Sequence, residues 1–336
     1  MIRYALPALL LAAVVQPVFA QNQPSSSPQS SSQQPTSSPE ALEWLQKIAA
    51  APQHYNYVGT FIYSSGGDIE TSRIIHLVNE GGEHEKSEVL DGAPREIIRN
   101  NDEMKCYLPD SKTVVTEKRW LRKVFPSLLP QPLTNLDENY VVKKGGQERI
   151  SDYLCQVIML EPRDDKRYGQ KLWVDANTGL LLKAAVMDKD QVVEQFVFTE
   201  LKIGGDIDKE LLKSKYLAQA DRWRTTNLIS SSTGSGKLGW EIKDPPRGFR
   251  KIVEMKRNLS DKSRPVSHIA LSDGLAAVSV FIEPMSKKIS RPGEGLYHSR
   301  GAINIYTRTV SDNMVTTVGE VPPATVMQIG NSVTSR

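Results

Sequence analysis

Short apolar runs with an alternating pattern follow one another closely along this 336-residue chain, and they constrain its fold more than any other feature. Alternation at period two is typical of strands with one buried face. The first set covers residues 57–63, 71–78, 85–90, 95–99, 104–108 and 113–117, and the second covers 149–160, 170–174, 180–188 and 192–203. Turn residues such as Gly66-Gly67 separate them. Because no helical pattern intervenes, the sequence predicts one large antiparallel sheet.

Helical patterns occur only at the ends of this strand-rich region and at the end of the chain. Ser37 or Ser38 can cap a helix that begins near Pro39, and residues 41–49 carry apolar side chains at helical spacing. Residues 208–216 predict a short helix, and a further helix begins at the prolines 322–323 after a second group of strands. The fold class is therefore α+β, with a large first domain and a small C-terminal α+β domain.

Composition divides the chain into five parts. Residues 1–20 have a basic start, an apolar stretch and the small-x-small site Val18-Phe19-Ala20, which predicts a secretory signal peptide rather than a membrane anchor. Residues 21–39 hold only Gln, Asn, Pro, Ser and Thr, and we expect a disordered spacer. The large domain is assigned to 40–218, a Ser/Gly-rich linker to 219–238 and the small domain to 239–332. The predicted signal peptide implies that the protein is exported.

Signatures of catalysis are missing from the sequence. The five histidines have no metal-ligand spacing, and His76 alternates with apolar neighbours as a structural histidine does. No Gly-x-Ser-x-Gly motif occurs, and Gly234-Ser235-Gly236-Lys237 lacks the first Gly and the final Ser or Thr of a phosphate loop. A net charge of +3, which loses Arg3 with the leader, does not fit nucleic-acid binding. We therefore expect no enzyme activity, no metal and no cofactor.

Residues 120–130 are apolar and interrupted by prolines. They predict either a loop over the open end of the sheet or the lid of a hydrophobic cavity, which curved antiparallel sheets readily form. For the second alternative the candidate lipid-binding side chains are Phe61, Tyr63, Trp120, Phe125, Leu128, Leu129, Trp173 and Phe196. Plain core packing is the other interpretation of each of them.

The chain has two cysteines, Cys106 and Cys155, both in predicted strands. In an oxidising compartment they predict a disulfide that closes a loop of about fifty residues. Two free buried thiols are the alternative. The pair lacks the Cys-x-x-Cys spacing of a redox centre.

Many ordered blocks resemble the RseB/MucB family of periplasmic sigma-E regulatory proteins. In the first domain the blocks are YVGTF (57–61), LDG (90–92) with PRE (94–96), CYLP (106–109), FPSLLP (125–130), RYG (167–169), KLW (171–173), TGLLLK (178–183) and EQF (194–196). In the second domain they are LSDGLA (271–276), FIEP (281–284) and GEVPPAT (319–325). The resemblance covers nearly the whole chain after the spacer.

This resemblance implies a periplasmic binding protein without an active site. The large domain of the family resembles LolA and LolB, a curved antiparallel half-barrel that accepts acyl chains. Family members bind the periplasmic segment of a membrane-spanning anti-sigma factor, RseA or MucA, and shield it from site-1 proteolysis by DegS. Lipopolysaccharide or mislocalised lipoprotein is expected to release it. A periplasmic lipid or lipoprotein carrier is the alternative function, and a homo-oligomer is left open.

We place the partner-binding residues of this chain in the second domain, where the family-like blocks are densest. Arg250, Asp273 and Glu283 are the candidate contacts because they are polar positions near the strand predicted at 276–282. Core packing accounts for the apolar positions of that strand.

Overall fold

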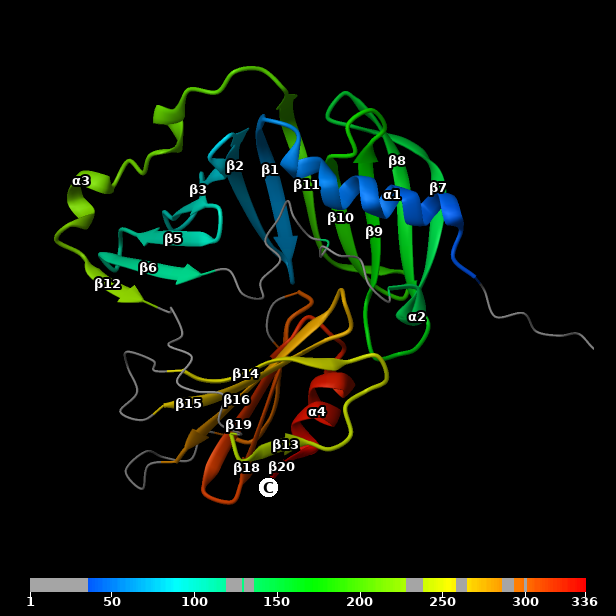
Figure 1. Ribbon diagram of the computed structural model, residues 1–336, viewed down its shortest axis with the longest axis vertical. Helices are drawn as coiled ribbons and strands as arrows, with labels where there is room; N and C mark the ends of the chain where they lie inside the picture. Colours follow the sequence, from blue (N-terminus) through cyan, green and yellow to red (C-terminus); the bar gives the residue numbers. More distant parts are fainter. Residues whose placement is uncertain are drawn as a thin grey trace, which may run out of the picture. The chain divides into compact units, whose positions relative to one another are not determined.

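The computed structural model describes residues 36–118, 129, 136–227, 238–257, 265–285, 293–298 and 301–336. Thr36–Arg336 form one compact unit that holds a 12-stranded, a six-stranded and a two-stranded sheet (Figure 1). The predicted signal peptide and residues 21–35 of the spacer lie outside the described residues. Of the helices in the described ranges, none is long and apolar enough to cross a membrane.

The large sheet is open and almost entirely antiparallel, which confirms the predicted α+β fold class. Its strands, in spatial order, are β12 (Arg224–Asn227), β6 (Thr113–Lys118), β5 (Glu103–Leu108), β4 (Glu96–Asn100), β3 (Gly82–Val89), β2 (Asp68–Asn79), β1 (Tyr57–Ser65), β11 (Gln191–Ile203), β10 (Leu181–Asp188), β9 (Gly169–Asp175), β8 (Tyr153–Pro162) and β7 (Tyr140–Ile150). All neighbours are antiparallel except β12 and β6. The pairing of β1 with β11 joins the two strand sets into one sheet.

The first helix, α1 (Pro39–Ala50), covers one face of the sheet near β7 and β8 (Figure 1). It begins where the sequence predicts, because the Ser38 hydroxyl accepts a hydrogen bond from the Ala41 amide at 3.2 Å. Leu45 and Ile48 point into the main core. The Ser37 hydroxyl also accepts from the Val142 amide, so the last residues assigned to the spacer are ordered against β7.

Three local predictions differ from the structure. Residues 149–160 are two strands, because Ser151 and Asp152 adopt positive φ and turn the chain between β7 and β8. The predicted helix at 208–216 is a single 3₁₀ turn, η2 (Lys209–Leu212), followed by the short α3 (Leu217–Ala220). The strand β12 lies within the segment assigned to the linker.

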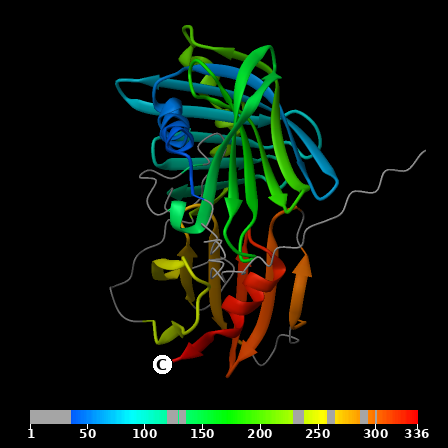
Figure 2. The same ribbon diagram turned by 90° about the vertical axis from the view of Figure 1, so that its right-hand side faces the viewer.

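The second sheet is smaller, as predicted, and packs against its own helix. Its strands, in spatial order, are β14 (Arg250–Arg257), β15 (Val266–Ser272), β16 (Ala277–Pro284), β19 (Asn313–Gly319), β18 (Asn304–Val310) and β17 (Gly295–His298), and the two-stranded sheet pairs β13 (Trp240–Ile242) with β20 (Val333–Ser335). The helix α4 (Pro323–Asn331) lies on β18 and β19 (Figure 2). A Cβ at Gly330 would stand 2.6 Å from the Tyr306 ring, so this close approach requires glycine.

Candidate functional site

The predicted lipid-binding side chains that the structure describes belong to the main buried core or, for Tyr63, pack against it. Tyr63 is paired with Phe196 across β1 and β11, and Phe61 lies 5.9 Å from Phe198 in an edge-to-face contact. Phe61 and Phe196 are 8% and 5% exposed and belong to the core under α1. The structure therefore brings Phe61, Tyr63 and Phe196 together as core packing on one face of the sheet.

The strand register places Trp173 on the opposite face of the sheet from Phe196, although it is also a buried member of the main core. Its indole donates a hydrogen bond to Glu148 at 2.7 Å, and the ammonium groups of Lys171 and Lys183 lie over its ring at 4.5 and 4.3 Å. Leu129 is a buried member of the main core. Trp120, Phe125 and Leu128, and with them most of the predicted lid, lie outside the described residues.

Asp273, a predicted partner contact, is instead the centre of a buried contact between the two sheets. Its side chain and that of Arg167 are both 0% exposed, and an Arg167 nitrogen stands 2.6 Å from the carboxylate. The Tyr140 hydroxyl donates to the same carboxylate oxygen at 3.1 Å. The other oxygen accepts from the backbone amides of Leu275 and Ala276. Both oxygens of this carboxylate are thus used within the chain.

Arg167 is held from several sides in this contact. Asp164, in the turn between β8 and β9, accepts two hydrogen bonds from its guanidinium, and the Arg247 carbonyl accepts a third at 2.6 Å. The Phe249 ring lies 5.1 Å from the guanidinium carbon. Multiple charge-assisted hydrogen bonds offset the cost of burying the charge. No sequence pattern marks Arg167 as the centre of a contact between domains, although it begins the family-like block 167–169.

The charges of the contact reinforce one another. Burial by itself lowers the pKa of the Arg167 guanidinium, but hydrogen bonds and charge from Asp164 and Asp273 outweigh burial and raise it. Burial, followed by the charge of Asp273, raises the pKa of the Tyr140 phenol well above its usual range. Arg167 is therefore cationic and Tyr140 a neutral hydrogen-bond donor, an arrangement suited to holding two sheets together.

Further hydrogen bonds surround this ion pair. The Asn139 amide donates to the Asp273 carbonyl at 2.9 Å, and the Thr325 hydroxyl donates to the Lys166 carbonyl. Asn304 donates to the Tyr168 hydroxyl. We call Asn139, Tyr140, Asp164, Arg167 and Asp273 the inter-sheet cluster.

The other two predicted partner contacts differ from Asp273. Arg250 is exposed and lies 3.5 Å from the carboxylate of Glu138, beside the inter-sheet cluster. Glu283 is half-buried on β16, opposite Met314 of β19. The three residues therefore do not form one surface, and two of them face the first sheet.

His76 has the structural role that its strand position predicts. Its Nε2 lies 2.7 Å from the Pro52 carbonyl, which can only accept, and its Nδ1 lies 3.3 Å from Glu85. Glu85 also accepts from Arg99 at 2.9 Å. Within the part of the chain that the structure describes, no three His, Cys, Asp or Glu residues are grouped as metal ligands.

The predicted disulfide is wrong for this structure, in which both cysteines are free thiols. Seven strands separate β5, which holds Cys106, from β8, which holds Cys155. The strand registers also place Cys106 on the face of Phe61 and Cys155 on the opposite face. A disulfide needs Cα atoms within about 7 Å, which these positions do not provide.

An open antiparallel sheet joined through a buried ion pair to a smaller sheet with its own helix defines a two-domain α+β protein. Known proteins identify the family. The MucB/RseB N-terminal domain model matches residues 40–216, and the MucB/RseB C-terminal domain model matches residues 234–334. The chain belongs to the MucB/RseB family.

Relatives with established names agree with these matches. The chain is 29% identical over 307 residues to the sigma factor AlgU regulatory protein MucB of Pseudomonas aeruginosa, with 89% of this chain and 92% of that protein covered. It is 27% identical over 295 residues to the sigma-E factor regulatory protein RseB of Salmonella typhimurium, covering 87% and 90%. The solved Pseudomonas aeruginosa MucA/MucB complex matches with a TM-score of 0.68 at 27% identity, covering 88% of this chain and 99% of that one.

Proposed function

We propose that this protein is a periplasmic negative regulator of a sigma-E type envelope stress response. It binds the periplasmic segment of a membrane-spanning anti-sigma factor and shields that segment from site-1 proteolysis. The observation that carries the proposal is the match of both domains, in one chain, to a relative that was solved bound to MucA. The predicted export signal supports the compartment.

Lipid is the proposed release signal. Lipopolysaccharide or mislocalised lipoprotein shifts the equilibrium only if it binds the free protein better than the complex. A coupling of about 1.4 kcal/mol between the two ligands weakens the complex tenfold. Burial of a few methylenes, at about 0.8 kcal/mol each, exceeds that requirement. The mechanism therefore needs binding and displacement, without a covalent step, so we propose that the protein is not an enzyme.

The inter-sheet cluster gives this regulator a structural basis for coupling. Residues of both sheets meet at Asp273, so a partner that touches both sheets depends on their relative placement. A ligand bound to one sheet can then alter the surface that the partner contacts. We propose Arg250 as a partner contact at the edge of this region, because its guanidinium is largely exposed.

Affinity capture from an envelope extract tests the function. The mature protein is immobilised, and retained proteins are identified by mass spectrometry before and after washing with lipopolysaccharide. A single anti-sigma factor that is eluted by the lipid wash supports both parts of the proposal. Capture of the anti-sigma factor without lipid elution contradicts the release step alone. A broad set of lipoproteins indicates a carrier, and capture of neither contradicts both functions.

A further inference from the structure

The two sheets meet at a second point, apart from the inter-sheet cluster. Glu194 on β11 accepts a hydrogen bond at 3.3 Å from the backbone amide of Ala302, in the turn before β18. Ala302 is 0% exposed although it lies in a turn. The neighbouring Gly301 comes so near β1 that a Cβ on it would stand 2.0 Å from the Ser65 hydroxyl and 2.9 Å from the Glu194 carboxylate. This close approach and a φ of +64° both require glycine at position 301.

The Tyr63 hydroxyl holds the Glu194 carboxylate from the side of the large sheet. It is hydrogen-bonded to the side chains of Ser65 and Glu194, and the pairing of β1 with β11 places Ser65 directly opposite Glu194. Burial, followed by the charge of Glu194, raises the pKa of the Tyr63 phenol well above its usual range, so the hydroxyl keeps its proton and donates to the carboxylate. The carboxylate is thus shared between a side chain of the large sheet and a backbone amide of the second domain. We call Tyr63, Ser65, Glu194, Gly301 and Ala302 the latch contact.

The latch contact and the inter-sheet cluster lie at different places along the same end of the large sheet. The latch contact is where β1 ends and β11 begins, and the cluster is where β7 begins and β8 turns into β9. The strand order β1, β11, β10, β9, β8, β7 separates the two contacts by two to three strand spacings, which is roughly 10–15 Å. The bond from Asn304 to Tyr168 belongs to the side of the cluster, because Tyr168 follows Arg167. Two separated contacts prevent a rotation of the second sheet that the cluster alone allows.

The two contacts differ in burial and in the number of bonds that form them. In the cluster, the side chains of Asp273 and Arg167 are both 0% exposed, and several charge-assisted hydrogen bonds surround them. Across the latch contact, among the described residues, the bond from the Ala302 amide to the half-buried Glu194 joins the two domains. A hydrogen bond to a partly solvated carboxylate costs less to break than a buried ion pair with its surrounding bonds. The latch contact is therefore the first of the two to open.

We propose that the latch contact opens while the inter-sheet cluster stays intact, and that the second domain then turns about the cluster. The Tyr63 hydroxyl positions the carboxylate that binds Ala302, so a movement of Tyr63 reaches the second domain through Glu194. The regulatory consequence rests on the proposed function. A partner that touches both sheets binds the closed arrangement better than the open one, and opening of the latch contact therefore weakens its binding.

Amide hydrogen exchange of the full-length mature protein tests the opening step without any partner. Gly301→Val places a side chain where the large sheet approaches, and we expect it to accelerate exchange of the Ala302 amide at least about tenfold. The amides of Leu275 and Ala276, which donate within the inter-sheet cluster, are expected to keep their exchange rates. Acceleration at both places means that the two contacts open together, and acceleration at neither means that Gly301 does not keep the latch contact closed. Every pattern other than the expected one overturns the proposal.

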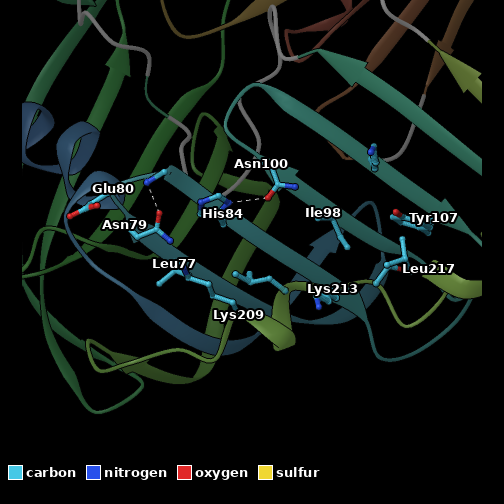
Figure 3. A pocket seen from close by; sticks show the side chains of 14 residues that line it. Leu77, Asn79, Glu80, His84, Ile98, Asn100, Tyr107, Lys209, Lys213 and Leu217 are labelled. Atoms are coloured by element: carbon cyan, nitrogen blue, oxygen red, sulfur yellow. Dashed lines mark hydrogen bonds between the residues drawn. The ribbon is translucent and has the colours of Figure 1, made fainter.

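Gly239→Val is the matched control for Gly301→Val. Gly239 also has a positive φ, +75°, but no atom of the described residues lies within 4 Å of its Cβ position. A second control, Leu217→Glu, changes the large sheet domain elsewhere, at the rim of a cavity of about 760 Å³ that Figure 3 shows beside Leu77 and Ile98. The residues of the latch contact do not line this cavity. If either control accelerates exchange at Ala302 as much as Gly301→Val does, then general loosening explains the effect and the proposal is wrong.

The role of the Tyr63 hydroxyl is tested by Tyr63→Phe, which is expected to accelerate exchange at Ala302 about threefold because Glu194 loses a donor. Tyr153→Phe is the control, since it removes a hydroxyl that donates to the Leu201 carbonyl, also on β11. Equal effects of the two variants contradict the positioning role of Tyr63.

Small-angle X-ray scattering measures the turning of the second domain. Gly301→Val is expected to have a larger radius of gyration than Gly239→Val, and equal radii overturn the turning step. Capture of the anti-sigma factor from envelope extract is expected to be weaker with Gly301→Val than with Gly239→Val, and equal capture contradicts the regulatory consequence. If the wild-type protein captures no anti-sigma factor, then the proposed function fails while the exchange and scattering results still decide whether the latch contact opens.

Discussion

Single residues decide how the two sheets are held together, and Asp273 is the most important of them. Asp273→Asn removes the charge that faces the buried Arg167. We expect the free energy of unfolding to fall by about 3 kcal/mol, since breaking a buried ion pair leaves one charge uncompensated. Urea denaturation followed by circular dichroism measures it. Asp152→Asn is the control, because Asp152 and Arg149 form an exposed pair and little change is expected.

The cysteines give a second prediction at this scale. Protein unfolded without reductant is expected to react with iodoacetamide at both Cys106 and Cys155, and mass spectrometry counts the adducts. If the measured mass shows no adducts, the two cysteines are joined by a disulfide after all. In the folded protein Cys155 is expected to react more slowly than Cys106, because it is 0% exposed and Cys106 is partly exposed.

Cys155 also contributes to the change of the free energy of unfolding with pH. Burial, followed by the charge of Asp175, raises the pKa of this thiol from 9.0 to about 12. The unfolded thiol ionises first as the pH rises, so the contribution is complete below pH 9.0 and is lost as the pH approaches 12. We expect Cys155→Ala to lose less stability above pH 9.0 than the wild type does. An equal alkaline loss in both proteins contradicts this assignment.

At the scale of elements, residues 209–217 are fixed to the large sheet through Glu96 on β4, whose side chain is 0% exposed and accepts a hydrogen bond from the Ser214 hydroxyl at 2.6 Å. Glu96→Gln removes the charge that Lys86 faces and weakens the bond to Ser214. Local opening of residues 209–217 is expected to become about tenfold more frequent, since one charge-assisted hydrogen bond contributes about 1.5 kcal/mol. Hydrogen exchange of these amides measures it.

The matched control for that experiment is Glu88→Gln. Glu88 binds Lys215 of the same stretch but is more exposed than Glu96, and Lys215 is about half exposed. A smaller effect on exchange is therefore expected. If both variants accelerate exchange equally, then burial of Glu96 is not what holds residues 209–217.

Elements also show where local patterns predict well. Residues 175–179, Asp-Ala-Asn-Thr-Gly, have the composition of a turn, and in the structure they join β9 and β10, with Asp175 accepting from the Thr178 amide and hydroxyl. In contrast, β7 was missed between Lys143 and Glu148, where six residues without apolar side chains carry no alternation. Its strand structure comes from pairing with β8 rather than from its own residues.

For the whole molecule, the assignment of a linker at 219–238 remains a prediction. A protease is expected to cut between Asn227 and Leu238, where the sequence is rich in serine and glycine. The two fragments should elute together on gel filtration, because the inter-sheet cluster and the bond from Thr325 to Lys166 connect them. Separation of the fragments without denaturant, or uniform degradation, contradicts this expectation.

The sequence by itself determined the strands with clear alternation, the capped helix after Ser38, the division into a large and a small sheet, and the family. These features depend on residues a few positions apart, or on blocks whose order is kept. Only the tertiary structure decided that Asp273 meets Arg167, 106 residues away, that the two cysteines lie on opposite faces, and that Ser214 meets Glu96, 118 residues away. Such contacts form when distant strands pair and bury side chains together, and single-sequence periodicity records the face of a strand but not its neighbour.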